Sequence, residues 1–231
     1  KEINEEYNES IIDYSKAIDL NPNNHAYINS RGIAYKYSDK YILAFEDFKR
    51  ADELSPYNYL YLNNLCEIEN LRENYESAIS YCTNSLAEKD DEYETYKERM
   101  LAYWGLNKFE LALKDLKSAM KVNSENKSDI VARGILKQEA GDYIGAKEDF
   151  NLFLKGEPDD EFVLDKRAFT NYQLEDYQAA KDDYSRLIEI NENNADNYYY
   201  LSKVLFESEE YLESLKNIDK AINISQEKYP S

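Results

Sequence analysis

Four arginines in the sequence are each followed, sixteen residues later, by an aspartate. The pairs are Arg31 and Asp47, Arg99 and Asp115, Arg133 and Asp149, and Arg167 and Asp183. Leu65 and Leu201 belong to the same evenly spaced series and are followed by Tyr81 and Asn217 instead. A guanidinium and a carboxylate can form two parallel hydrogen bonds. Because aspartate occurs only where arginine does, we expect four structural ion pairs. The alternative is that these arginines bind the carboxylate of a ligand.

Residues able to support catalysis are scarce. His25 is the only histidine, and no Cys, Ser or Asp stands at a spacing that would bring it to this side chain. The sequence contains no Gly-rich phosphate loop, no paired-histidine metal motif and no Ca²⁺ loop. The acidic runs 90–92 and 159–161 fall at expected turns, where they favour the beginnings of helices. We therefore expect no enzyme, no cofactor and no metal site.

Two cysteines, Cys66 and Cys82, are too few for a framework of disulfides. They occupy positions that elsewhere in the sequence hold Gly32 or Gly134 and Phe48 or Phe150, and that we expect to face inward between paired helices. We favour two buried, reduced thiols that pack as small apolar groups. A bond between them is the alternative, because the two positions could approach each other closely enough.

The net charge of −19 comes from 47 acidic and 28 basic residues. Phosphate backbones and anionic lipids are bound through Lys and Arg, so this charge excludes nucleic acid and anionic lipid surfaces as partners. The acidic surface serves either solubility alone or a preference for neutral or basic protein partners. No run of apolar residues approaches the roughly 18 needed to span a membrane.

The sequence begins with Lys1 rather than Met, so we expect a fragment or a processed chain. The compartment is left open. We favour a soluble, cytoplasmic protein over an exported, processed one.

A pattern with a constant period runs through the whole sequence. An aromatic residue recurs at Tyr7, Tyr41, Tyr75, Phe109, Tyr143, Tyr177 and Tyr211. A small residue follows three positions later, at Ser10, Ala44, Ala78, Ala112, Ala146, Ala180 and Ser214. Pro22, Pro56 and Pro158 share one position at the expected turn between units. A fixed period of this length is typical of repeat architectures.

The spacing and these aromatic, small and proline positions resemble the tetratricopeptide repeat (TPR) family, whose unit is two antiparallel helices over about 34 residues. The resemblance implies an all-α solenoid of antiparallel helix pairs, wound as a right-handed superhelix. It covers a half unit, 1–24, and six full units: 25–58, 59–92, 93–126, 127–160, 161–194 and 195–228. We expect one continuous solenoid domain over residues 1–231.

In this family the first helix of each unit lines the concave surface, which implies a groove for a peptide. Its residues would be Asn64, Lys97, Leu101, Trp104, Phe162, Lys166, Phe169, Tyr172, Tyr199, Tyr200, Lys203 and Phe206. Exposed aromatics are common anchors of peptide recognition. The alternative is that several of them pack between units, since the chain holds 23 tyrosines.

Some members of the family hold the terminal carboxylate of a chaperone with basic and Asn side chains. Within 25–126 those places hold Asn29, Ile33, Asn64, Glu94 and Glu98, so only Asn64 matches and the two basic places are acidic. Within 93–194 only Lys97 and Lys166 match. Acids would repel a carboxylate, so we expect no such clamp.

The sequence therefore predicts a non-catalytic scaffold or adaptor that binds a peptide or a helix of a partner protein in the groove. One alternative is a structural assembly module, because both ends of the solenoid lack polar capping helices and could associate into homo-oligomers. Another alternative is a regulatory domain of a larger protein.

Overall fold

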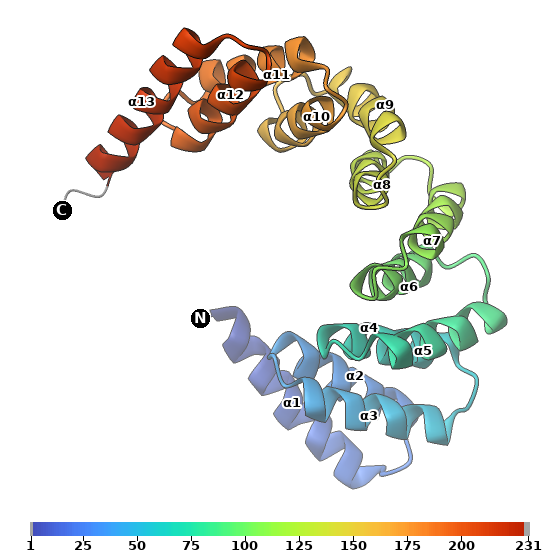
Figure 1. The fold of residues 1–231 in the computed structure, drawn as a ribbon. Helices are drawn as coiled ribbons and strands as arrows, with labels where there is room; N and C mark the ends of the chain where they lie inside the picture. Colours follow the sequence, from blue (N-terminus) through green and yellow to red (C-terminus); the bar gives the residue numbers. More distant parts are fainter. Residues whose placement is uncertain (1, 229–231) are drawn as a thin grey trace. The chain divides into compact units, whose positions relative to one another are not determined.

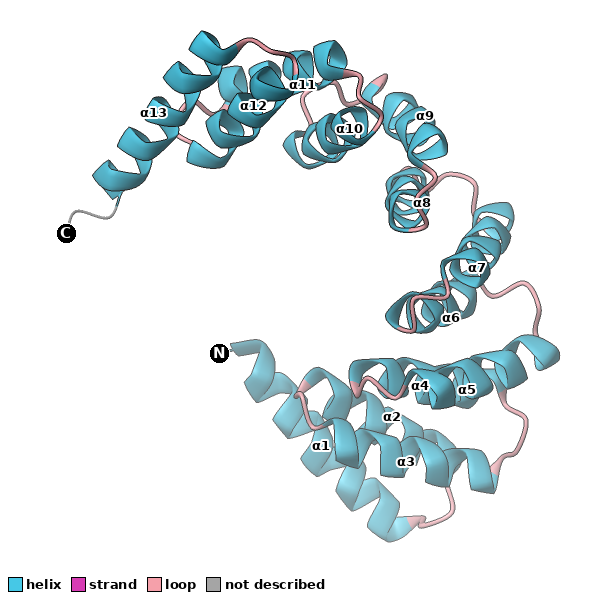
Figure 2. Cartoon of the chain, viewed as in Figure 1, coloured by secondary structure: helices cyan, strands magenta, loops and turns pink. Residues whose placement is uncertain are grey.

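The computed structural model describes residues 2–228, with side chains from 6 to 226. This part of the chain consists of thirteen α-helices joined by short turns and contains no strand (Figures 1 and 2). The helices are α1 (Glu2–Leu20), α2 (His25–Tyr37), α3 (Tyr41–Leu54), α4 (Tyr59–Leu71), α5 (Tyr75–Glu88), α6 (Tyr93–Gly105), α7 (Phe109–Val122), α8 (Ser128–Glu139), α9 (Tyr143–Leu154), α10 (Glu161–Gln173), α11 (Tyr177–Ile190), α12 (Ala195–Glu207) and α13 (Tyr211–Lys228). No helix in this range combines the length and apolarity needed to cross a bilayer.

The period of the sequence is the period of the helices. The second helix of each full unit (α3, α5, α7, α9, α11, α13) begins at the recurring aromatic residue. Each first helix packs against the second helix of its own unit, and within each compact unit defined below it also packs against the second helix of the unit before it. The predicted fold class, an all-α solenoid of antiparallel helix pairs, is confirmed in the described residues. The handedness of the superhelix stays a prediction.

One turn geometry closes the first helix of every full unit. The residues at this turn are separated by one period of the sequence, and each has a positive φ between 55° and 80°: Asp39, Glu73, Asn107, Gly141, Glu175 and Glu209. The amide of the following residue donates to the carbonyl five positions earlier, for example Asp142 N to Lys137 O at 2.8 Å. This combination of a left-handed residue and a six-residue hydrogen-bonded loop is a Schellman motif. It gives each helix pair the same sharp reversal.

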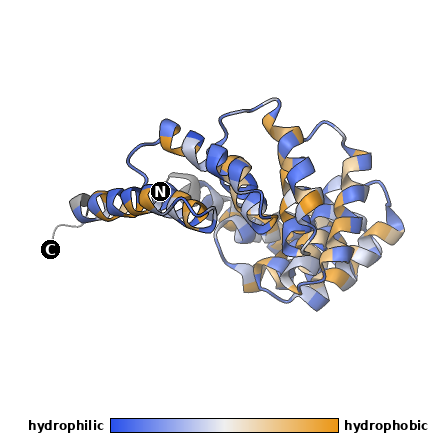
Figure 3. Cartoon of the chain, turned by 45° about the horizontal axis from the view of Figure 1, so that its top comes forward, coloured by the Kyte–Doolittle hydropathy of each residue, from blue (hydrophilic) through white to orange (hydrophobic). Residues whose placement is uncertain are grey.

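Apolar side chains occupy one side of each helix, and Figure 3 shows hydrophobic and hydrophilic residues alternating along the helices. The small residues of the repeat are fully buried at Ala44, Ala78, Ala112, Ala146 and Ala180, where they allow neighbouring helices to approach. Gly32 and Gly134 serve the same purpose. A Cβ added at Gly32 would lie 2.7 Å from the ring of Phe48, and one at Gly134 would lie 2.6 Å from the ring of Phe150.

Cys66 and Cys82 take the places of that Gly–Phe contact in the unit 59–92. The structure joins them in a disulfide, with their Cα atoms 5.3 Å apart. The expectation of two reduced thiols is therefore wrong for this structure. The expectation that both side chains face inward is confirmed, since both residues are fully buried. The bond forms because α4 and α5 bring these two inward positions together, whereas in two other units a bulky ring fills the space beside a glycine.

The chain divides into two compact units, Lys1–Glu125 and Asn126–Ser231. The division falls at the predicted boundary between the repeats 93–126 and 127–160. The connection there differs from the others: Lys127, which precedes α8, is itself helical in φ and ψ, whereas the residues that precede the other first helices of full units are extended, at Asn24, Asn58, Glu92, Asp160 and Asn194. A single continuous solenoid stays a prediction, and each unit is described by itself below.

Candidate functional site

The structure brings each of the four arginines to the aspartate sixteen residues later. Nε and Nη2 of each guanidinium donate to the two carboxylate oxygens, at distances between 2.5 and 3.0 Å. The aspartates are buried, and the arginine side chains are largely covered. Even the most exposed of these arginine side chains has a relative accessibility of only 23%. A guanidinium with both of these donors engaged and little exposed surface is poorly placed to bind a ligand's carboxylate.

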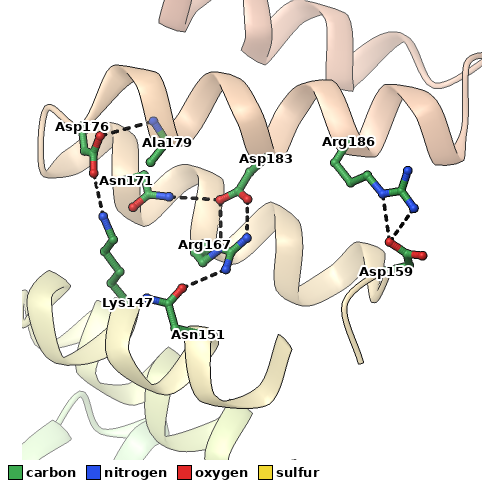
Figure 4. Close-up of polar contacts among 9 residues, drawn as sticks. All are labelled: Lys147, Asn151, Asp159, Arg167, Asn171, Asp176, Ala179, Asp183 and Arg186. Atoms are coloured by element: carbon green, nitrogen blue, oxygen red, sulfur yellow. Dashed lines mark hydrogen bonds and ion pairs between the residues drawn. The ribbon is translucent and has the colours of Figure 1, made fainter. Parts of the chain in front are cut away.

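Three of these arginines also contact the unit before their own. Nη1 of Arg167 donates to Asn151 Oδ1 on α9 at 2.8 Å, so Arg167 lies between α9 and α11 (Figure 4). Arg31 reaches Ser15 on α1, and Arg99 reaches Thr83 on α5. Asn171 on α10 adds a fourth polar group by donating to Asp183 Oδ2 (Figure 4). Each of these three clusters therefore holds three successive helices together, which is a structural role.

Exposed aromatic side chains are concentrated on the first helices. Of nine exposed Phe and Tyr side chains in the described residues, seven lie there: Tyr27, Tyr37, Phe162, Phe169, Tyr199, Tyr200 and Phe206. The other two are Tyr57 in a turn and Tyr211 at the start of α13. Exposed Ile, Leu and Val lie mostly on α1 and the second helices, for example Ile42, Ile144 and Leu212. The two kinds of helix thus present different surfaces.

In the unit 1–125, the predicted groove residues lie on α4 and α6. Asn64 Nδ2 donates to Asn29 Oδ1 on α2 at 2.7 Å, and Lys97 lies over the ring of Tyr93. Leu101 and Trp104 line a hollow of about 560 Å³, together with residues of α4.

In the unit 126–231, the chain's own lysines cover part of the aromatic surface. Lys166 lies 5.3 Å from the ring centre of Phe162, and Lys203 lies 5.7 Å from that of Tyr172 and 5.9 Å from that of Tyr199. The expected groove residues of this unit therefore include both aromatic rings and the cations that lie over them.

The tyrosines and phenylalanines of this unit also contact one another. Tyr200 stacks on Tyr184 and meets Tyr199 edge to face. Burial raises the pKa of Tyr184 far above its usual value, so its hydroxyl stays neutral. Phe206 packs against Tyr211. Several of the predicted groove residues thus pack within the chain while part of each ring stays accessible.

The concave face expected from the sequence includes Glu67, Asn70 and Glu98, although they are not among the predicted groove residues, and it misses Tyr75. Glu67, Asn70, Tyr75 and Glu98 line the hollow on α4 to α6 beside Leu101 and Trp104. The acidic signs of Glu94 and Glu98 were visible in the sequence, but only as a mismatch to a carboxylate clamp. Asn70 and Glu98 are separated by less than one repeat period. A search for polar pairs at this shorter separation, instead of at the full period, could have found the site.

Groups with catalytic potential are few among the described residues. His25 Nδ1 lies 2.6 Å from the hydroxyl of Tyr61, where it joins α2 to α4. No group of three or more His, Cys, Asp or Glu side chains in this part of the chain is arranged to hold a metal ion.

Comparison with known proteins places the fold. Residues 164–194 match the model of the tetratricopeptide repeat family. No curated protein matches the sequence significantly. Among solved structures, the C-terminal part of a TPR repeat-containing protein from Cytophaga hutchinsonii is 18% identical over 95% of this chain and 94% of that one, with a TM-score of 0.78. A tetratricopeptide repeat protein from Parabacteroides merdae is 20% identical over 97% and 94%, with a TM-score of 0.66. YrrB, described as a TPR protein with an unusual peptide-binding site, is 16% identical over 78% and 93%, with a TM-score of 0.65. At these identities the likeness shows the fold alone.

Proposed function

We propose that the chain is a tetratricopeptide repeat protein and acts as a non-catalytic adaptor that binds an extended peptide or a helix of a partner protein on the faces of its first helices. The observation that carries this proposal is the concentration of exposed aromatic side chains on those helices. An exposed aromatic ring loses contact with water over a large area on binding and has few rotamers to immobilise. The peptide-binding site described for YrrB supports the same role for this fold.

The partner that fits this chain is neutral or basic. The net charge of −19 repels anionic partners such as nucleic acid and slows their approach. Lys166 and Lys203 are local exceptions to this negative charge. Both cations lie over aromatic rings in the unit 126–231.

The test is an array of short random peptides probed with the full chain and with two triple variants. The first variant removes exposed first-helix aromatics, Phe162→Ala, Phe169→Ala and Tyr199→Ala. The matched control removes exposed aliphatic residues of second helices, Ile42→Ala, Ile144→Ala and Leu212→Ala. We expect the first variant to lose about tenfold or more in affinity, since aromatic anchors dominate such interfaces, and the control to bind as the parent does. Equal losses in both variants, or no bound peptide, would contradict the proposal.

A second candidate is an assembly module that associates with copies of itself. It is favoured by α13, where Leu212, Leu215 and Ile222 are exposed on one helix. Light scattering of the same two triple variants separates the candidates, because self-association through α13 would be weakened by the control variant and left intact by the aromatic one.

A further inference from the structure

The hollow in the unit 1–125 is built from apolar walls and oxygen acceptors. It opens between α4 and α6 and is lined by Glu67, Asn70, Leu71, Tyr75, Glu98, Leu101, Trp104, Gly105 and Asn107. A Cβ added at Gly105 would lie 2.6 Å from Cζ of Tyr75, so only glycine allows this ring to lie against the end of α6. Tyr75, Trp104, Leu71 and Leu101 therefore surround a small number of polar groups.

Those polar groups are acceptors with too few donors. Lys36 Nζ donates to Glu67 Oε1 at 2.6 Å. Asn70 Nδ2 donates to both Oε2 and the backbone carbonyl of Glu98 at 2.8 Å. Oδ1 of Asn70 is buried and has no hydrogen-bond partner in the described part of the chain. Among the described residues of this unit, no Lys or Arg forms an ion pair with Glu98. The carboxylates of Glu67 and Glu98 thus share the charge of one cation, Lys36.

The pKa of Glu98 also indicates a shortage of positive charge in the hollow. Burial raises the pKa of this carboxyl, and the negative charges of Glu67 and Glu94 raise it further. The hydrogen bond from Asn70 and the charge of Lys36 oppose the shift without cancelling it. A second cation close to Glu98 would offset both the cost of burying its charge and the repulsion from Glu67 and Glu94.

We propose that this hollow binds a basic side chain of the partner segment, arginine in preference to lysine. The proposal rests on the adaptor function and names the chemistry of its ligand. A guanidinium has five donors in a planar fork and can donate to the carboxylate of Glu98. Its plane stacks on aromatic faces such as those of Trp104 and Tyr75, and its stem covers Leu71 and Leu101.

The corresponding place in the unit 126–231 has the opposite charge. There Gln138 Nε2 donates to the backbone carbonyl of Lys166, as Asn70 Nδ2 does to that of Glu98. The residue at the position of Glu98 is thus Lys166, which itself lies over Phe162. A guest cation is repelled at this position, so the basic-side-chain site belongs to the unit 1–125.

Trp104 is the only tryptophan in the chain, so its fluorescence reports on the hollow directly. The probes are blocked peptides of sequence Ac-Gly-Ser-X-Ser-Gly-NH2, with arginine, lysine, citrulline or glutamate at X. Citrulline has the shape of arginine without its charge. We expect a saturable change with arginine, weaker binding of lysine, about tenfold weaker binding of citrulline because charge-assisted hydrogen bonds are lost, and none with glutamate.

Two variants complete the test. Glu98→Gln keeps an acceptor for Asn70 but removes the charge, and we expect about tenfold weaker binding of the arginine peptide. Glu76→Gln is the matched control, because it removes one exposed acid of α5 outside the hollow and changes the net charge equally. Thermal melting of Glu98→Gln verifies that the variant is folded.

Equal binding of the arginine and citrulline peptides, or equal effects of the two variants, would overturn the proposal. The adaptor function is judged separately by the peptide array. If the array still shows binding that only the first-helix aromatic variant abolishes, the basic-side-chain site falls and the adaptor function stands.

Discussion

At the residue scale, the repeated arginine–aspartate pairs stabilise the fold. Each aspartate is buried, and each guanidinium joins the two helices of one unit. In the unit 59–92 the same two positions hold Leu65 and Tyr81, where Leu65 is fully buried. The positions therefore accept either a polar pair or an apolar pair, but an unmatched charge would be left without a partner.

Arg99→Leu alone should lower the free energy of unfolding by about 3 kcal/mol, because it leaves the buried Asp115 unpaired. Adding Asp115→Tyr, which reproduces the pair at 65 and 81, should restore most of that loss. Urea unfolding of the two variants and the parent measures both values. A double variant no more stable than the single one would show that the pair is not coupled.

Glu98→Gln should make the protein more stable at pH 7 while it weakens binding of basic peptides. The raised pKa means that the folded state binds the proton more tightly than the unfolded state, whose glutamates titrate near about 4.3. The parent therefore gains stability as the pH falls through the raised pKa, and its deficit against Glu98→Gln disappears. Melting temperatures of both proteins between pH 7 and pH 4 test this, and a constant difference across that range would contradict it.

Pairs of residues that recur at the same two positions of each repeat could be predicted from the sequence, whereas the hollow could not. The arginines and aspartates vary together at a constant separation, so their contact is visible in the alignment of repeats. The hollow combines Asn70 and Trp104, which share one repeat position on successive first helices, with Glu98, which stands at another position. Their meeting depends on how one first helix packs on the next, which periodicity alone does not specify.

At the scale of elements, the fixed length of the helix pairs comes from the turn between them. The aromatic position marked the beginning of the second helix correctly in every full unit, whereas α1 begins before its aromatic residue, Tyr7. The left-handed residue two positions before it escaped prediction. Gly, the residue that favours this conformation, stands there only at Gly141, while the other five units use Asp, Glu or Asn.

Replacing Glu73 by Gly should therefore stabilise the protein by about 1 kcal/mol, because a Cβ is unfavourable at positive φ. Gly141→Ala should cost a similar amount. A Cβ at Gly141 would meet nothing within 4 Å, so the effect would be that of the backbone alone. Glu73→Ala is the control for loss of the charge and should change little. The measurement is urea unfolding, and a destabilised Glu73→Gly would contradict the explanation.

The disulfide between α4 and α5 is a second feature of this scale. It joins residues separated by 16 positions, and closing a loop of that length in the unfolded chain stabilises a protein by about 3 kcal/mol. Dithiothreitol should lower the free energy of unfolding of the parent by about 3 kcal/mol. It should leave that of the double variant Cys66→Gly/Cys82→Phe unchanged. That variant copies the Gly–Phe contact of two other units. Two free thiols in the denatured, unreduced parent would contradict the bond.

At the scale of the whole molecule, first and second helices present different surfaces to a partner. The aromatic side chains are exposed on first helices, the acidic hollow lies between two of them, and second helices expose mainly aliphatic residues.

Hydroxyl-radical footprinting of the full chain, with and without the peptide that binds best on the array, identifies the helices that contact the partner. We expect reduced oxidation of Trp104, Phe169 and Tyr199, with Tyr57 and Leu212 unchanged as exposed controls outside the first helices. Protection of Leu212 and of other second-helix residues, with the first-helix aromatics oxidised as before, would contradict it.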